Sequence, residues 1–366
     1  MLVFDANSGG APAVHVLCIG VGDYFFMPRP GKVMPPETVG KFHPETPIMN
    51  RLTSPQPSAR AVADWFIANQ DRLEAPLGTV QLLIGSDPTG QISSGATLAE
   101  VKAAAKKWWD LCNQNADNVA IFYFCGHGVS DPNTSQSILL LQDFGDINEE
   151  FWRNAVNFEH FKLSMGSNEA MTQVFLLDAC RNVPKSYMDI PRQGLSTLLT
   201  GRPLMISGKN VPVIRAATLN QTAEGTVNDQ SRFCSVLIDC LNHYAATEVG
   251  NRWQVTVDSL GSAVKAVGNP RPRQKLPAIF EVGGETVSDQ SLLTVKEPKA
   301  FAKVFFAPDS LGPLAGIEAK GLGRFSGDQE PVTFSVPVGP VELQRPGDPD
   351  WRTCHAKPPL LVLEEF

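Results

Sequence analysis

The sequence of 366 residues contains no apolar run near the roughly 20 residues that a membrane-spanning helix needs. Residues 1–20 also lack the basic start and small-residue cleavage site of a signal peptide. Basic residues are not in excess, since 31 lysines and arginines face 38 aspartates and glutamates, giving a net charge of -7. Such a surface matches a phosphate backbone poorly. We therefore expect a cytoplasmic protein that binds neither nucleic acid nor a membrane.

Paired cysteines are missing as well. The seven cysteines are odd in number and scattered, and no two pairs stand at the short spacing of a zinc site. Two familiar glycine motifs are incomplete: GVGDYF has only two of the three glycines of a dinucleotide fingerprint, and no Gly-x-Ser-x-Gly occurs. We expect reduced thiols, no metal and no cofactor, which leaves a reactive cysteine as one source of chemistry.

What the sequence does contain is a soluble, globular composition, with 43% hydrophobic and 19% charged residues. Short apolar runs alternate with segments of helical period, which predicts an α/β fold with a mostly parallel sheet of about six strands flanked by helices. We predict strands at 13–22, 79–85, 118–126, 173–180, 211–218 and 275–282, a strand or hairpin at 137–143, and helices at 58–68 (with Ser58 as N-cap), 98–112, 158–165 and 232–245.

The pattern of apolar and turn-forming residues changes at about residue 296. Three apolar stretches, KVFFAP, VTFSVPVGPVELQ and PLLVLEEF, are separated by Gly, Pro and Asp clusters and show no helical period. We predict a main domain over 1–290 and a small β-rich domain over 296–366.

A histidine and a cysteine stand at the ends of two predicted strands. IFYFCGHG places His127 just after one strand, and VFLLDACRN places Cys180 at the end of another. A thiol attacks a peptide carbonyl as thiolate, so it needs an imidazole to take its proton and later protonate the leaving amine. Backbone N–H groups at Cys180 and Gly128 could hold the oxyanion. The alternative is that Cys180 is a small buried side chain and His127 an ordinary turn residue.

The motifs FYFCGHG and LLDACRN resemble the histidine and cysteine motifs of the caspase and metacaspase family of cysteine peptidases. Their spacing of 53 residues (180 minus 127) and their order also match that family. The resemblance covers residues 12–283, includes IGVGDY, ATLNQTAEG and RFCSVLIDCL, and is that of a prokaryotic caspase-like protease. It implies a caspase-like sandwich, a dyad of His127 and Cys180, and Gly128 in the oxyanion hole.

Three residues are predicted to bind substrate. Asp178 lies two positions before Cys180 and therefore points to the same side of the strand, where its carboxylate could pair with a basic side chain. Metacaspases, which this sequence resembles here, carry Asp at this position and prefer Arg or Lys before the scissile bond. Asp23 is a second candidate, and Asn220 stands near a position where metacaspases often place an acidic residue. Asp178 could instead cap a loop, and Asp23 could form an Asx turn.

The sequence predicts a cysteine endopeptidase that cleaves protein substrates after Arg or Lys, in a regulated or defence pathway. The alternatives are a catalytically silent interaction module with this fold and a thiol acyltransferase. Arg181 and Asn182 depart from the His and Ser that commonly follow the metacaspase nucleophile, and calcium ligands of that family have no match here. An activating protease or self-cleavage is a further hypothesis, at the basic residues between nucleophile and next strand: Lys185, Arg192, Arg202 and Lys209.

Overall fold

The structure is a computed structural model of the whole chain, and its residues cluster into two compact units. The first unit holds Met1–Ser235 and Ile279–Ser288, and the second holds Val236–Ala278 and Asp289–Phe366. The structure describes residues 1–6, 9–26, 51–85, 95–131, 133–146, 149–182, 194–199, 207–219, 223, 227–269, 280–306, 316–327 and 331–363.

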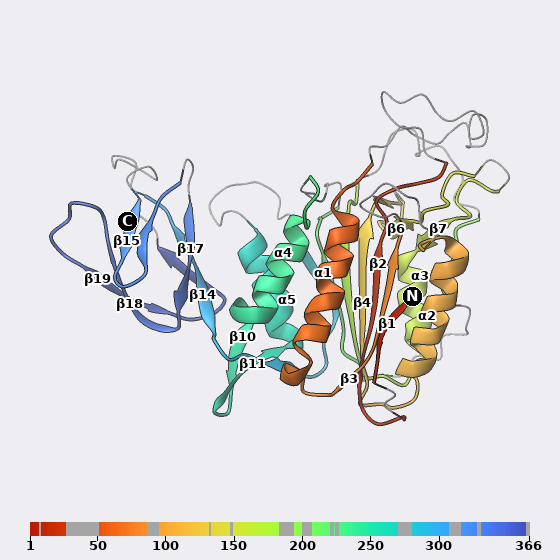
Figure 1. Ribbon diagram of the computed structural model, residues 1–366, viewed down its shortest axis with the longest axis horizontal. Coiled ribbons are helices and arrows are strands. Elements are labelled where there is room, and N and C mark those ends of the chain that lie inside the picture. Colours follow the sequence, from red (N-terminus) through yellow and green to blue (C-terminus); the bar gives the residue numbers. More distant parts are fainter. Residues whose placement is uncertain are drawn as a thin grey trace. The chain divides into compact units, whose positions relative to one another are not determined.

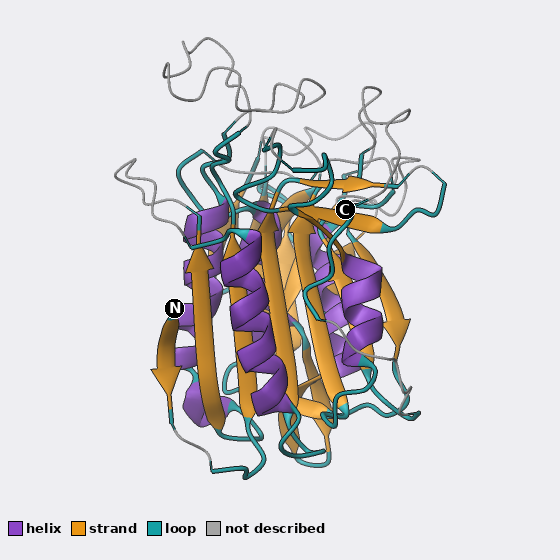
Figure 2. Ribbon diagram, turned by 90° about the vertical axis from the view of Figure 1, so that its right-hand side faces the viewer, coloured by secondary structure: helices purple, strands orange, loops and turns teal. Residues whose placement is uncertain are grey.

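A seven-stranded sheet forms the centre of the first unit, in the order β1-β3-β2-β4-β8-β9-β12. The inner strands are parallel, and β1 and β12 pair antiparallel at the two edges. In Figure 2 the arrowheads of the parallel strands end at one common edge. The strands are β1 (Leu2–Asp5), β2 (Val14–Gly20), β3 (Leu77–Ile84), β4 (Val119–Gly126), β8 (Thr172–Ala179), β9 (Val211–Arg215) and β12 (Glu281–Glu285).

The predicted α/β architecture is confirmed, with two differences at the sheet edges. Strand β1 was not predicted, so the sheet has seven strands and not six. The last strand begins at Glu281, six residues later than the predicted start, and residues 275–279 lie outside the described part. The inner strands were predicted correctly because both of their faces are buried, which gives unbroken apolar runs in the sequence.

Helices cover both faces of this sheet (Figure 1). Helix α1 (Pro55–Ala68), followed by a 3-10 turn η1 (Gln70–Arg72), packs on one face, and α2 (Leu98–Cys112) and α3 (Phe158–Met165) lie on the other. Helix α2 begins with a capping box of Thr97 and Glu100, and the Asn157 side chain caps α3. The prediction that α1 starts at Ser58 was wrong: Ser54 is its N-cap, because prolines are tolerated in a first turn.

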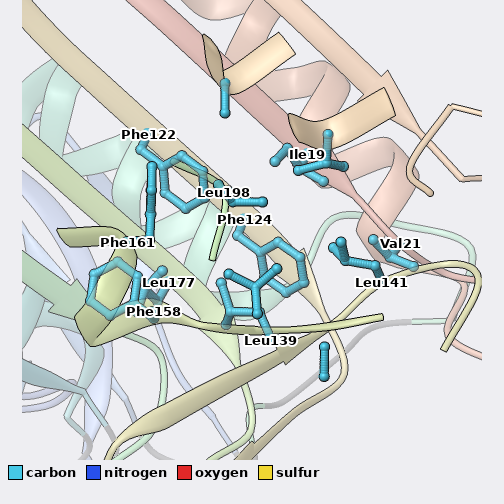
Figure 3. Packing of buried hydrophobic residues seen from close by; sticks show 14 of the residues in the cluster. Ile19, Val21, Phe122, Phe124, Leu139, Leu141, Phe158, Phe161, Leu177 and Leu198 are labelled. Carbon is cyan, nitrogen blue, oxygen red and sulfur yellow. The ribbon is translucent and has the colours of Figure 1, made fainter. Parts of the chain in front are cut away.

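Alternating residues of each inner strand point to opposite faces, and this decides where the functional side chains lie. Phe122 and Phe124 of β4 and Leu177 of β8 pack in the core on the α2 and α3 side (Figure 3). Their neighbours in the sequence, which include Tyr123 and Asp178, therefore point to the opposite face, where α1 lies.

A small antiparallel sheet follows β4, formed by β5 (Gly128–Ser130), β6 (Ser137–Leu140) and β7 (Ala155–Asn157). Strand β6 of this sheet corresponds to the predicted strand or hairpin at 137–143. The first strand of the sheet starts one residue after His127, so the chain that carries the histidine is anchored immediately on both sides.

The second unit contains helices and three small sheets. Its sheets run in the orders β10-β11-β13, β17-β14-β20 and β16-β15-β18-β19, and Val304, Phe334 and Leu343 are among the residues of its apolar core. Helix α4 (Arg232–Asp239) starts in the first unit and continues as a π-helical turn η3 (Cys240–Tyr244). No helix in the described ranges is both long and apolar enough to cross a membrane. The remaining elements are β10 (Ala246–Val249), β11 (Arg252–Thr256), α5 (Val257–Gly268), β13 (Ser291–Thr294), β14 (Lys299–Val304), β15 (Ile317–Ala319), β16 (Gly323–Phe325), β17 (Val332–Pro337), β18 (Gly339–Gln344), β19 (Arg352–Ala356) and β20 (Leu360–Leu363).

Candidate active site at the carboxyl edge of the sheet

The predicted site residues follow the ends of three neighbouring parallel strands, at one edge of the sheet. Strand β2 lies between β3 and β4, so the connection from β3 to β4 crosses it, and the order of strands reverses there. The carboxyl edge at such a reversal is where open α/β sheets bind ligands. Asp23 follows β2, His127 follows β4, and Cys180 follows β8.

The pairing of β4 with β8 places His127 and Cys180 at equivalent positions. Cys125 is the register partner of Asp178, and Gly126 is the partner of Ala179. His127 and Cys180 are therefore the first residues beyond two adjacent strand ends. The two chains stay together afterwards, because Ser130 N–H donates a hydrogen bond of 3.1 Å to the Asn182 carbonyl.

Gly128 touches the nucleophile segment directly. A Cβ at this position would lie 2.7 Å from the carbonyl oxygen of Cys180 and 2.9 Å from Cβ of Ala179. No side chain fits that space, so the close approach of the two strand ends requires glycine here. The backbone that follows His127 is thus packed against the backbone of Cys180.

The buried His127 is held through its backbone and its ring. Its N–H donates to Tyr24 Oη at 2.8 Å, and its carbonyl accepts the Leu140 N–H at 3.1 Å. The rings of Tyr24 and His127 have their centroids 5.1 Å apart and are tilted by 37°. Tyr24 comes from the segment after β2, so all three parallel strands contribute to the placement of His127.

Cys180 is one of two cysteines that are partly exposed, the other being Cys354, and the remaining five are buried. Burial raises the pKa of the Cys180 thiol, and the charge of Asp178 adds to this increase. The Ala223 N–H, which donates to the sulfur at 3.3 Å, acts in the opposite direction. A thiol with a raised pKa needs a base before it can attack, which is the role predicted for His127.

Asp178 lies beneath the strand ends and is buried. Its Oδ2 accepts the Tyr123 hydroxyl at 2.8 Å and also the Ser231 hydroxyl. Burial raises the pKa of this carboxyl, while the hydrogen bonds from Ser231, Tyr123 and Cys125 oppose the increase. The carboxylate thus lies on the α1 side of the sheet, since Ser231 is itself bonded to Ser58 of α1.

Asp23 is also buried at this edge. Its Oδ1 accepts the Tyr24 N–H at 3.1 Å, which is an interaction between neighbouring residues. Its Oδ2 lies 3.9 Å from Nε of Arg51, a guanidinium that remains one-third exposed. A second carboxylate therefore stands next to the residue that contacts His127.

Two further predictions concern the segments around the site. Asn220 lies outside the described residues, as do Lys185, Arg192 and Arg202 of the predicted cleavage loop. Lys209 is only 5% exposed, and its amine donates to the Asn168 carbonyl and, at 3.3 Å, to that of Ala170. Burial lowers its pKa to about 8. Lys209 is therefore not presented to solvent as a cleavable loop residue would be.

The roles of Tyr24 and Ser231 at the site were not predicted from the sequence, and neither was the ion pair of Arg181 with Glu281. Tyr24 could have been noticed from its place directly after Asp23 at a strand end. Ser231 stands before a predicted helix, so its role as a cap was readable, but its bond to Asp178, 53 residues away, was not. Within the described residues, no three His, Cys, Asp or Glu side chains gather as a metal site would require.

Comparison with known proteins agrees with this geometry. The family model described as the caspase domain matches residues 81–274, more than half of the 366 residues. His127, Cys180 and Asp178 lie within that span, whereas Asp23 and Tyr24 precede it. The uncharacterized protein y4kE of Sinorhizobium fredii (strain NBRC 101917 / NGR234) is 25% identical over 322 residues, covering 78% of this chain and 88% of the relative.

Proposed function

The chain belongs to the caspase-domain family, and we propose that it is a cysteine endopeptidase that hydrolyses peptide bonds after arginine and lysine. The observation that carries this proposal is the register of β4 and β8, which brings His127 and Cys180 to adjacent strand ends at one level. Gly128, packed on the Cys180 carbonyl, supports the same arrangement.

The proposed reaction runs through an acyl-enzyme. His127 takes the proton of the Cys180 thiol, and the sulfur attacks the carbonyl carbon of the scissile bond. The carbonyl oxygen becomes an oxyanion that the backbone N–H groups of Cys180 and Gly128 would stabilise. The protonated His127 then gives its proton to the leaving amine as the C–N bond breaks. Water, deprotonated by His127, hydrolyses the thioester and returns the thiol.

The basic specificity is argued from two carboxylates. Asp178 lies two residues before Cys180, and its charge acts on the Cys180 thiol. Asp23 stands beside Tyr24, which contacts His127. The position of Arg51 near Asp23 supports the view that a guanidinium is accepted at this edge. A carboxylate in a site of low polarity attracts a guanidinium and repels an acidic side chain. Asn220 stays a prediction.

The cellular setting of this activity is proposed from the state of the cysteines. All seven cysteines are free, which supports a reducing compartment, and we place the enzyme in the cytoplasm. We further propose a regulated proteolytic or defence pathway, with activation by calcium, by self-cleavage or by an upstream protease as the options to be tested.

The test is a substrate profile of the purified protein. Fluorogenic peptides that end in Arg, Lys or Asp are incubated with the enzyme, with and without calcium, and compared with Cys180→Ala and His127→Ala. We expect turnover of the Arg and Lys peptides only, and its loss in both variants. Cys354→Ala is the matched control, because it removes the other partly exposed thiol. Turnover that survives Cys180→Ala rejects the dyad, and complete inactivity under every condition supports a silent interaction module.

A further inference from the structure

Ser231 links the start of α4 to Asp178 through one hydroxyl group. Its Oγ accepts the Cys234 N–H at 3.0 Å, as an N-cap side chain does, and its proton is donated to Asp178. Because a serine hydroxyl has a single proton, the bond accepted from the helix leaves that proton for the carboxylate. The Ser231 N–H donates to Ser58 Oγ at 2.9 Å, which fixes the residue against α1.

The acceptor oxygen is shared between two elements. Asp178 Oδ2 accepts hydrogen bonds from the Tyr123 hydroxyl of β4 and from the Ser231 hydroxyl at the start of α4. Both donors favour the ionised carboxylate over the protonated acid. Burial works against them. The titratable groups that face this carboxyl are Tyr123 and Cys125 of β4, Cys180 at the end of β8, and Cys234 of α4.

We propose that Ser231 is a positioning residue for Asp178 and thereby determines how strongly the site prefers a cationic side chain over a neutral one. This inference rests on the proposed function, since it takes Asp178 as the carboxylate that receives the basic side chain. Without the Ser231 donor, Asp178 takes up a proton at higher pH, and a protonated acid attracts a guanidinium much less. The Ser231 hydroxyl bonds Asp178 and the Cys234 N–H, and any change in the Cys180 pKa through the charge of Asp178 acts equally on every substrate.

The chain offers well-matched variants. Ser231→Gly removes the hydroxyl, and glycine is tolerated as an N-cap, so the helix start is largely retained. Ser231→Thr keeps the hydroxyl. Ser235→Ala is the control, since the Ser235 hydroxyl donates to the Ser231 carbonyl at 3.2 Å. Tyr123→Phe removes the second donor to the same oxygen without any part in helix capping.

The experiment compares two fluorogenic peptides that differ only in arginine or citrulline before the scissile bond, with kcat and KM measured from about pH 5 to about pH 9. In Ser231→Gly we expect the arginine-to-citrulline ratio of kcat/KM to fall toward the acid end of this range, by up to about tenfold, which is the limit for a rise of about one unit in the Asp178 pKa. The ratio should recover as the pH rises, and the loss should lie in KM for the arginine peptide. Tyr123→Phe should shift the same way, whereas Ser231→Thr and Ser235→Ala should follow the wild type.

Two results would overturn this inference alone: a wild type that prefers arginine together with a Ser231→Gly ratio unchanged at every pH, or an equal loss for both peptides, which is what a merely structural role produces. A wild type that does not prefer arginine over citrulline rejects the proposed specificity itself, and this inference with it. Thermal unfolding of each variant checks folding. Should Ser231→Gly not fold, Tyr123→Phe decides the question, because it removes a donor from the same carboxylate oxygen.

Discussion

The guanidinium of Arg181, the residue after Cys180, lies 2.6 Å from the Glu281 carboxylate at the start of β12. It also donates to the Ser135 carbonyl at 3.1 Å. The other oxygen of Glu281 lies 3.7 Å from Arg215, at the end of β9. Both arginine side chains are only 9% exposed, and Glu281 pairs with both of them beside the nucleophile, while Glu159 gives Arg215 a second carboxylate at 3.4 Å. The backbone of Cys180 is therefore tied to β9 and β12.

Glu281→Gln should weaken this arrangement, because it removes the charge and keeps the shape. Breaking a buried ion pair is costly since the partner charge stays buried, and Glu281 is itself 35% exposed, so we expect a loss of about 2 kcal/mol in the free energy of unfolding. A lower kcat should accompany it if the N–H of Cys180 is displaced. Urea denaturation and kinetics measure both.

The control for this change is Glu342→Gln. Glu342 pairs with Lys320 at 2.6 Å, but both side chains are more than one-third exposed, and an exposed pair contributes about 1 kcal/mol or less. Equal losses from the two substitutions would show that the pair beside Cys180 has no special importance.

Gly128→Ala should abolish most activity. The added Cβ would meet the Cys180 carbonyl oxygen at 2.7 Å, so one of the two strand ends has to move. We expect a destabilisation of about 1–3 kcal/mol, as for other overpacked sites, and a loss of kcat because the predicted oxyanion donors separate. Gly283→Ala is the control, since its Cβ would make only an ordinary contact of 3.5 Å with Arg215. A fully active Gly128→Ala enzyme would remove Gly128 from the site.

The sequence was most informative where local signals coincide with burial. Helices α2 and α3 begin and end as predicted, because a capping side chain stands before an apolar period in each. The parallel strands were also found, and with them the positions of His127 and Cys180, since strands buried on both faces leave unbroken apolar runs.

What the sequence did not reveal depends on distant contacts. Strand β1 (LVFD) is only four residues long and none of its residues is buried, so its short apolar stretch gave no strand signal. Helix α5 was missed although Thr256 and Ser259 form a capping box, because its buried face includes the small residues Gly261, Ala263 and Gly268. The bond of Ser231 to Asp178 and the pairing of Arg181 with Glu281 join residues 53 and 100 positions apart, and no local pattern encodes them.

The burial of His15 predicts that the free energy of unfolding decreases in acid. This buried histidine lies 2.9 Å from Thr79 Oγ1, and burial lowers its pKa to about 4. In the unfolded chain its pKa is near 6.5, so below that value the unfolded state binds a proton first, and stability is lost as the pH falls toward 4. The loss should approach about 3 kcal/mol. Urea denaturation of the wild type and His15→Gln at several pH values measures it, and a constant difference between the two proteins would contradict the prediction.

Alkylation by iodoacetamide tests the state of Cys180 in the resting enzyme. Its raised pKa predicts a protonated thiol at neutral pH, and only the thiolate reacts, so the rate should rise about tenfold per pH unit through the neutral range. Mass spectrometry of the folded protein should find adducts on Cys180 and Cys354 and none on the five buried cysteines. The Cys180→Ser variant should still form the adduct on Cys354 and no other, which controls for access of the reagent. Rapid alkylation of Cys180 at a rate independent of pH near neutrality would contradict the prediction, because it would mean that His127 and Cys180 already exist as an ion pair before substrate binds.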